Sequence, residues 1–271
     1  MKKAIFTITL TSVFLLSCKT NSNSEVSILK TDKKAQEVII ENCMAEASKY
    51  MLYSRERAEE LDKGLKIDST IAYLWQQKAM PLFKQGKYEI GMKFIDKAVI
   101  YDRNNYQEYR AFIKCIFAKT YQEAIQDFED CKIQNGNSYV MDHSYDFHIA
   151  LSYLQLNEFE KAEEIFKNDI ETLRKSKGDD WVHHLDLFYY GISIYEQKKY
   201  EEAIIIFDLA LLKYPNFSDV QFYKTLSLFS LGKNEEAKIL FELGKSNNEK
   251  GYTINEDNVS YEKYPYQIVS W

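Results

Sequence analysis

The histidines and their acidic neighbours are the first residues that could do chemistry. Imidazoles combined with carboxylates are the groups that hold Zn²⁺ in proteins. Two such groups occur: His143 and His148 near Asp142 and Asp146, and His183 and His184 near Asp179, Asp180 and Asp186. Neither group has a histidine pair four residues apart on a helix or a Cys partner, and adjacent histidines point in different directions on a helix. We therefore predict no metal site and no cofactor.

Other catalytic patterns do not emerge from the sequence. We find no Gly-rich phosphate loop and no nucleophile elbow. Carboxylates are many, but pairs such as Glu163-Glu164 and Glu201-Glu202 fit solvated helix faces rather than a fixed acid–base pair. The formal net charge of −6 argues against a nucleic-acid surface. The chain is therefore predicted not to be an enzyme and not to bind nucleic acid.

The stretch 184–217 shows how the chain is organised. Its first half predicts a helix with one small and aromatic face, and its second half predicts another after a short polar link. The residues on these faces are Leu187, Tyr190, Gly191 and Ile194, then Tyr200, Ala203, Phe207 and Ala210. Pro215 lacks an N–H and can end the second helix. Small residues would let two antiparallel helices approach closely while the aromatic residues fill the space beside them.

This pattern resembles the tetratricopeptide repeat (TPR), which has a period of about 34 residues. The small position recurs at Gly91, Ala124, Ala162, Ala203 and Ala237, at spacings of 33, 38, 41 and 34 residues. The extra residues fall near 139–142 and 177–183, where we expect loops. The resemblance implies an all-α fold, a right-handed α-solenoid of about six TPR helical hairpins over residues 35–251. The expected repeats are 38–71, 72–105, 106–138, 143–176, 184–217 and 218–251.

The N-terminal residues predict where the protein is located in the cell. Lys2 and Lys3 precede an apolar run, and residues 1–17 are predicted to be a signal peptide. The sequence Leu15-Leu16-Ser17-Cys18 resembles the bacterial lipobox, which implies a lipid anchor (palmitate) at Cys18 and membrane attachment. A buried apolar helix is the alternative. Residues 18–34 are polar and are predicted to be a flexible tether. By resemblance to Gram-negative lipoproteins, Lys19 favours the outer membrane, facing the periplasm, and exposure at the cell surface stays open.

Three further cysteines, Cys43, Cys115 and Cys131, have the positions of small buried packing residues. A bridge between Cys115 and Cys131 remains an alternative. The last segment, residues 252–271, breaks the repeat and is rich in aromatic residues. We predict a capping tail on the last hairpin, because an exposed terminal repeat leaves apolar surface in water. The alternative is a segment that folds into the array's own groove and competes with a partner.

The resemblance also implies a binding groove, since the first helix of each TPR hairpin lines the inner surface. The implied groove residues are Tyr73, Gln76, Met80, Phe83, Gln107, Arg110, Lys114, Phe117, Phe147, Leu151, Phe188, Ile192, Tyr195 and Phe222. Arg110 and Lys114 lie one turn apart and could receive a carboxylate or be solvated beside acidic neighbours. The aromatic positions could equally be buried between helices.

The expected function is that of a lipid-anchored protein–protein interaction scaffold of the bacterial cell envelope. It would bind a peptide or protein segment in the concave groove, because a prebuilt aromatic surface offsets the entropy lost by a docking peptide. Two alternatives remain open. One is a structural subunit or spacer of an outer-membrane assembly or of a pilus or secretion complex, without peptide binding. The other is an accessory to an envelope glycan-processing enzyme.

Overall fold

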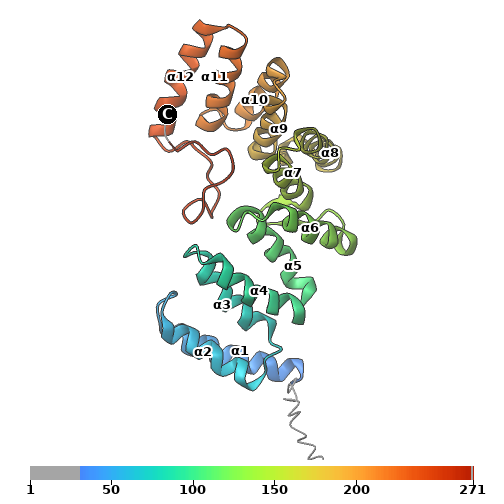
Figure 1. Ribbon diagram of the computed structural model, residues 1–271, viewed down its shortest axis with the longest axis vertical. Coiled ribbons are helices and arrows are strands. Elements are labelled where there is room, and N and C mark those ends of the chain that lie inside the picture. Colours follow the sequence, from blue (N-terminus) through green and yellow to red (C-terminus); the bar gives the residue numbers. More distant parts are fainter. Residues whose placement is uncertain (1–30, 270) are drawn as a thin grey trace, which may run out of the picture.

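The computed structural model describes residues 31–269 and 271, and in this part twelve α-helices form six antiparallel hairpins (Figure 1). Successive hairpins stack into a right-handed solenoid, which confirms the predicted all-α architecture. The helices are α1 (Lys33–Ala47), α2 (Arg55–Ile67), α3 (Ala72–Phe83), α4 (Tyr88–Tyr101), α5 (Arg103–Phe112), α6 (Tyr121–Asn135), α7 (Tyr145–Gln155), α8 (Phe159–Lys177), α9 (His184–Glu196), α10 (Tyr200–Lys213), α11 (Ser218–Ser230) and α12 (Asn234–Glu249). The predicted signal peptide, Cys18 and most of the tether lie outside the described residues.

The small residues of the repeat lie where two helices meet. A Cβ atom on Gly191 of α9 would fall 2.5 Å from the ring of Phe207 on α10. In the second hairpin the roles are exchanged, because a Cβ atom on Gly91 of α4 would fall 2.5 Å from the ring of Phe83 on α3. Ala203 is fully buried beside the first of these contacts. Each glycine therefore provides a flat patch of backbone on which an aromatic ring of the facing helix packs.

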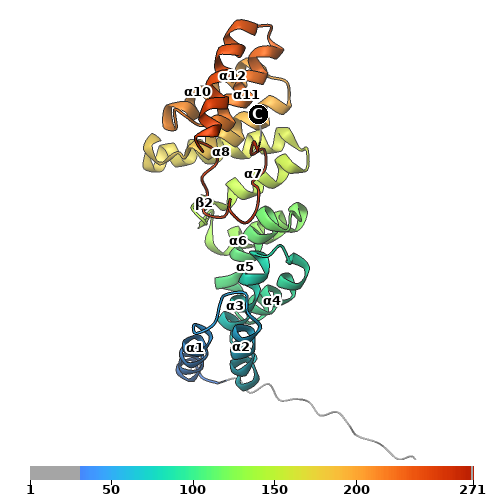
Figure 2. The same ribbon diagram turned by 90° about the vertical axis from the view of Figure 1, so that its left-hand side faces the viewer.

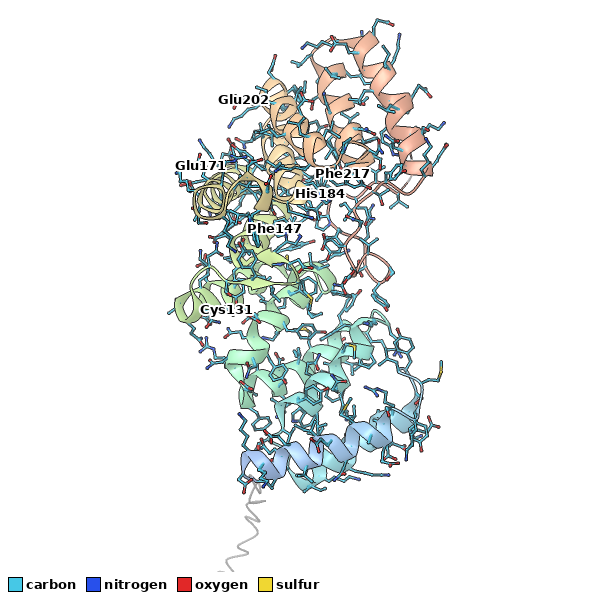
Figure 3. The ribbon with its side chains drawn as sticks, turned by 180° about the vertical axis from the view of Figure 1, so that it is seen from behind. Cys131, Phe147, Glu171, His184, Glu202 and Phe217 are labelled. Carbon is cyan, nitrogen blue, oxygen red and sulfur yellow. The ribbon has the colours of Figure 1, made fainter. Side chains whose placement is uncertain are left out.

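Aromatic side chains form the core that runs through the stack. The largest fully buried ones are Tyr145, Tyr189, Phe83, Phe112, Phe128, Phe147, Phe166, Phe188, Phe207 and Phe217. Their rings pack on one another within and between hairpins: Phe147 meets Phe166 and Tyr189 edge to face, and Phe166 is stacked on Tyr189. Figure 3 shows Phe147 and Phe217 between the helices, whereas Glu202 lies at the outer edge. Burying one such side chain stabilises the fold by about 1.5–3 kcal/mol, so this column holds the hairpins together.

The first extra segment of the repeat pattern is a small β-hairpin rather than an irregular loop. Strands β1 (Tyr139–Val140) and β2 (His143–Ser144) pair antiparallel, and Met141 and Asp142 connect them with φ angles of 48° and 68°. Positive φ at both central residues is typical of the two-residue turns that close tight hairpins. The second extra segment is a 3₁₀ turn at Asp179–Trp181 before α9. Both insertions leave the stacking of α6, α7, α8 and α9 intact.

The cysteines are packing residues in the described part of the chain. Cys43, Cys115 and Cys131 are all free and buried, so the alternative of a Cys115–Cys131 bridge is not realised. Burial raises the pKa of the Cys115 thiol to about 12, which keeps it protonated and unreactive. Among the described residues, no helix has the length and apolar character needed to span a bilayer.

Residues 252–271 leave the end of α12 and turn back along the inner side of the solenoid. Figures 1 and 2 both show this C-terminal tail beside α11 and extending past α7 towards the middle of the array. Near its start, the amide of Ser218 donates to the Tyr252 carbonyl at 2.8 Å. The tail therefore follows the groove side of the stack rather than ending at the last hairpin.

Candidate functional site

The C-terminal tail is fixed at its base by one carboxylate. Asp219, at the start of α11, is fully buried and accepts hydrogen bonds from two tail amides, Ile254 at 3.1 Å and Ile268 at 2.7 Å. Burial raises the pKa of Asp219 to about 6, although both amide bonds favour its charged form. Because Ile254 and Ile268 are 14 residues apart, this single side chain closes the tail into a loop.

The tip of the tail reaches the second and third hairpins. Glu262 forms an ion pair of 2.7 Å with Lys119, which follows α5, and also accepts a hydrogen bond from the hydroxyl of Tyr88 on α4. The ammonium of Lys84 lies 4.5 Å from the ring centroid of Tyr261. The loop thus bridges from α11 to the α3–α4 turn across the inner face of the solenoid.

Aromatic contacts fill the space between these polar anchors. Tyr264 is buried, and the Tyr189 hydroxyl of α9 donates to the Pro265 carbonyl at 3.0 Å. Tyr266 packs against Tyr223 of α11, with ring centroids 5.7 Å apart. The inner face therefore binds a turn-rich loop of chain through buried aromatic side chains and hydrogen bonds to its backbone.

The final residue seals the last hairpin. Trp271 packs edge to face on Phe222 of α11 and on Phe241 of α12, with centroid separations of 5.1 and 5.4 Å. It lies directly against Gly244, where a Cβ atom would collide with the indole. Trp271 therefore covers the end of the last hairpin, and the preceding part of the tail lies against α9 and α11.

Five of the predicted groove residues lie inside the array. Phe83, Phe147, Leu151, Phe188 and Ile192 are each at most 1% exposed and pack between helices. On α9 the side chain that touches the tail is instead Tyr189, one residue beyond the expected Phe188. On α11 the expected Phe222 touches Trp271, and the next residue, Tyr223, touches Tyr266. The face of α9 that meets the tail is therefore shifted by one residue from the TPR template, whereas α11 meets the tail at the expected residue as well. The only signal of this shift in the sequence was the second aromatic residue beside Phe188.

The predicted basic pair forms an internal network. Arg110 on α5 contacts Asp127 on α6 through two bonds, of 2.6 and 2.9 Å, and Asp96 on α4 through one of 2.8 Å. Lys114 reaches the same Asp127 at 2.9 Å and Glu123 at 3.3 Å. Burial alone would raise the pKa of Asp127, but hydrogen bonds from Arg110 and Lys114 outweigh it and lower the pKa. Gln107, a further predicted groove residue, also donates to Asp127.

Other predicted residues surround a cavity at the tip of the tail. Gln76, Met80, Phe83 and Phe117 line a space of about 240 Å³ together with Asn258 of the tail. Tyr73, Tyr195 and Phe222 are half-buried elsewhere along the first helices of their hairpins. The structure therefore brings four of the predicted groove residues together beside the tip of the tail, places Phe222 against Trp271, and disperses the rest.

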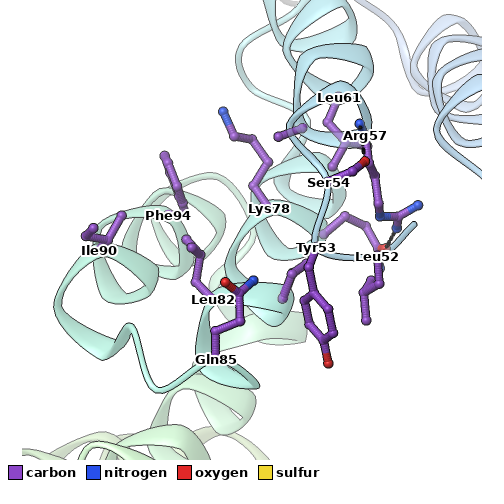
Figure 4. Close-up of a pocket in the computed structure, with 13 residues that line it drawn as sticks. Leu52, Tyr53, Ser54, Arg57, Leu61, Lys78, Leu82, Gln85, Ile90 and Phe94 are labelled. Atoms are coloured by element: carbon purple, nitrogen blue, oxygen red, sulfur yellow. Dashed lines mark hydrogen bonds between the residues drawn. The ribbon is translucent and has the colours of Figure 1, made fainter. Parts of the chain in front are cut away.

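A second cavity was not foreseen from the sequence. It has a volume of about 240 Å³ and lies between α2, α3 and α4, with Leu82, Ile90 and Phe94 on one side and Leu52 and Tyr53 on the other (Figure 4). Arg57 on its wall is 8% exposed and donates to Gln77 at 3.1 Å. Arg57 occupies a position at which the TPR pattern has a small residue.

The two histidine groups, separate in the sequence, meet at one place. The rings of His143 and His183 have centroids 5.3 Å apart, and Glu256 of the tail lies 3.6 Å from Nε2 of His143. His148 and His184 pack in the aromatic core, His148 stacked on Phe128 at 5.1 Å. Only the junction of His143, His183 and Glu256 has the geometry of a ligand-binding cluster in the described part of the chain.

Comparisons with known proteins agree with this architecture. Residues 187–216 match a family model described as "Tetratricopeptide repeat". No curated protein matches the chain. The matched residues lie within the stretch 184–217, in which the sequence pattern predicted a tetratricopeptide repeat.

Solved structures of similar shape are TPR proteins of low sequence identity. One is a tetratricopeptide repeat protein from Parabacteroides merdae, with a TM-score of 0.60 and 18% identity over 81% of this chain and 88% of that one. PilW, a type IV pilus biogenesis factor, has a TM-score of 0.61 and 10% identity over 80% and 96%. YrrB, described as a TPR protein with an unusual peptide-binding site, has a TM-score of 0.50 and 15% identity over 71% and 94%. These likenesses establish the fold, a TPR solenoid.

Proposed function

We propose that this chain, a tetratricopeptide-repeat solenoid, is a non-catalytic scaffold that binds a protein segment on its inner face. The observation that carries the proposal is the C-terminal tail, which shows the chemistry this face accepts. Two of its backbone amides bind Asp219, its acidic Glu262 binds Lys119, its Pro265 carbonyl accepts from the Tyr189 hydroxyl, and its Tyr266 ring packs on Tyr223. The expected partner segment is therefore aromatic and acidic.

The tail and such a partner would compete for the same surface. A segment joined to α12 by a short connection has an effective concentration on the order of millimolar. A partner must therefore bind the free groove well enough to displace the tail. Its apparent affinity equals its affinity for the free groove multiplied by the fraction of chains in which the tail is released. This arrangement makes the scaffold selective, because weak aromatic peptides would not displace the tail.

The N-terminal motif supports a location of the scaffold at a membrane. Cys18 of the lipobox-like sequence would carry the lipid anchor, and the polar residues to Lys34 would let the solenoid stand away from an outer membrane. PilW, a structural neighbour, is a pilus biogenesis factor, which is consistent with a role in an envelope assembly. Metabolic labelling with palmitate tests the anchor: wild type should be labelled, and Cys18→Ala should not. Equal labelling of both chains would refute the anchor at Cys18.

A spacer without a partner segment is the second candidate, and the docked tail is the observation that favours it. If the tail never leaves, the groove is simply part of the core. Photo-cross-linking in cells separates the two candidates. A photo-cross-linker would replace Phe229, which is exposed on α11, in the wild-type chain and in the Glu262→Lys variant. The substitution loosens the tail because it removes the ion pair with Lys119.

The scaffold proposal expects cross-linked partner to increase with Glu262→Lys and to fall when Tyr223→Ala is added. A matched control, Leu212→Ala, alters an exposed apolar side chain on α10 and should change nothing. Identical partner yields in all four chains would favour the spacer and overturn the groove proposal.

A further inference from the structure

A buried nitrogen points to a binding site at the base of the tail. His143, on β2, is 3% exposed, and its Nε2 has no hydrogen-bond partner within the described part of the chain. Leaving a buried polar atom unpaired costs about 1–3 kcal/mol, so such an atom calls for an explanation. Nε2 faces the carboxylate of Glu256 at 3.6 Å, and His183 lies beside both.

We propose that His143, His183 and Glu256 bind a divalent transition-metal ion, with Zn²⁺ as the best match. Each residue offers one ligand atom, and these atoms lie within 4.8 Å of one another. Two imidazoles and one carboxylate with an open fourth position are a recurrent zinc ligand set, and imidazole ligands disfavour Mg²⁺ and Ca²⁺. This site goes beyond the scaffold role and stands whether or not a partner enters the groove.

The geometry needs only small movements to close around an ion. Ligand atoms about 2.0–2.1 Å from a tetrahedral zinc ion are about 3.3 Å apart, close to the separation of His143 and Glu256. Glu256 belongs to the tail and His183 is exposed, so both side chains can approach the buried His143. A cavity of about 400 Å³, which Asp142, Asn255 and Asp257 also line, gives the ion access and room for a water molecule as fourth ligand.

A second carboxylate, that of Asp186, contacts both histidines and holds them in place. Asp186 on α9 lies 3.3 Å from Nδ1 of His143 and accepts the backbone N–H of His183 at 3.0 Å. Metal-bound histidines characteristically donate their other nitrogen to such a carboxylate, which fixes the ring and its tautomer. On binding, the ion would replace any proton on His143 Nε2, which leaves to solvent. His183 would carry its ring proton on Nδ1, giving up a long 3.4 Å contact with the Leu185 amide.

The position of the site determines its effect. His143 and His183 belong to the two segments inserted between hairpins, and Glu256 belongs to the tail. An ion shared by all three would fasten the tail to the middle of the solenoid. Zinc would then stabilise the tail-docked state by mass action, since it binds that state and not the released one.

Cobalt binding to the full chain tests the site. Tetrahedral Co²⁺ has intense visible absorption, and we expect one Co²⁺ per chain, displaced by Zn²⁺. Glu256→Gln and His183→Gln each remove one ligand from a partly exposed position and should weaken binding at least about tenfold. Glu249→Gln, a carboxylate exposed on α12, is the matched control and should bind like wild type. Hydrogen exchange of residues 252–266 should slow when Zn²⁺ is added to wild type but not to Glu256→Gln.

Two results would overturn the proposal. One is wild type that shows no tetrahedral Co²⁺ spectrum at stoichiometric metal. The other is a spectrum and affinity that survive either Glu256→Gln or His183→Gln unchanged, since the ion would then lie elsewhere. Circular dichroism of each variant confirms that the solenoid is folded, so a lost spectrum reports the ligand and not the fold.

Discussion

Lys119 and Glu262 form an ion pair of 2.7 Å although 143 residues of chain separate them. Lys119 follows the first helix of the third hairpin, and Glu262 is at the tip of the C-terminal tail. The contact exists only when the tail lies along the inner face. It therefore reports directly on whether the groove is filled by the chain itself.

Reversing one charge of this pair should loosen the tail without unfolding the solenoid. Lys119 is 44% exposed but Glu262 only 17%, and Glu262 also accepts a hydrogen bond from Tyr88, so Glu262→Lys should cost about 1–3 kcal/mol, confined to the docking of the tail. It should therefore speed hydrogen exchange of residues 258–264. The double variant Lys119→Glu/Glu262→Lys restores opposite charges and should restore protection. Equal exchange in wild type and Glu262→Lys would show that the pair does not hold the tail.

The glycine contacts of the hairpins predict a large effect from a single methyl group. Gly191→Ala places a Cβ atom against the ring of Phe207, and overpacking of this kind costs about 1–3 kcal/mol. Adding Phe207→Leu should cost less in the Gly191→Ala chain than in wild type, because the ring that clashes is gone. Denaturant unfolding of the four chains gives the coupling energy. Additive effects would contradict the close packing of these two positions.

The network around Asp127 predicts that Arg110 is structural. Arg110 and Lys114 share Asp127, which is 5% exposed. Asp127→Ala leaves two cations without their main partner and should cost about 3 kcal/mol or more, as the breaking of buried ion pairs does. Arg103→Ala, which removes a half-exposed pair with Asp130, should cost less than about 1 kcal/mol. Thermal unfolding of both variants compares them, and equal losses would show that the Asp127 network is no more than a surface contact.

Acid should detach the first helix before the rest of the array. Asp68 is 1% exposed and accepts hydrogen bonds from Thr31, Gln36 and Thr70. Burial would raise its pKa, but these hydrogen bonds outweigh burial and lower the pKa below its ordinary value. A carboxylate with a lowered pKa in the folded state contributes stability above its unfolded pKa, and this stability is lost as pH falls below about 4.

Hydrogen exchange of α1 between neutral and acidic pH measures this loss. Protection of α1 should decrease as pH falls, and Asp68→Asn should show weakened protection already at neutral pH, by about 2 kcal/mol. The pH dependence should be smaller in this variant. An identical pH profile in both chains would assign the acid sensitivity of α1 to another group.

The sequence predicted the fold because small and aromatic residues recur at fixed spacings, and these spacings bring them into contact inside a helical hairpin. Gly191 and Phe207 illustrate this, since their spacing alone places them face to face. The groove was harder, because side chains one position apart on a helix point about 100° apart. Phe188 and Tyr189 are both aromatic, and only the packing of neighbouring hairpins decides which of them enters the core.

The histidine cluster could not be predicted for a different reason. His143 and His183 are 40 residues apart in two insertions, and Glu256 lies another 73 residues on. No local spacing encodes their meeting, so the sequence favoured no metal site. The place of Glu256 beside the two histidines depends on the path of the tail, which in turn depends on Asp219 and Lys119.

The most direct measurement of the central proposal uses the tail itself as ligand. A synthetic peptide of residues 252–271 is titrated calorimetrically into wild type and into a chain whose own tail carries Glu262→Lys and Tyr264→Ala, leaving the groove unchanged. We predict that the peptide binds the variant at least about tenfold more tightly than wild type, because the native tail competes at an effective concentration on the order of millimolar. A peptide with the same two substitutions should not bind. Equal affinity for both chains, or no binding to the variant, would contradict a groove that the tail and a partner share.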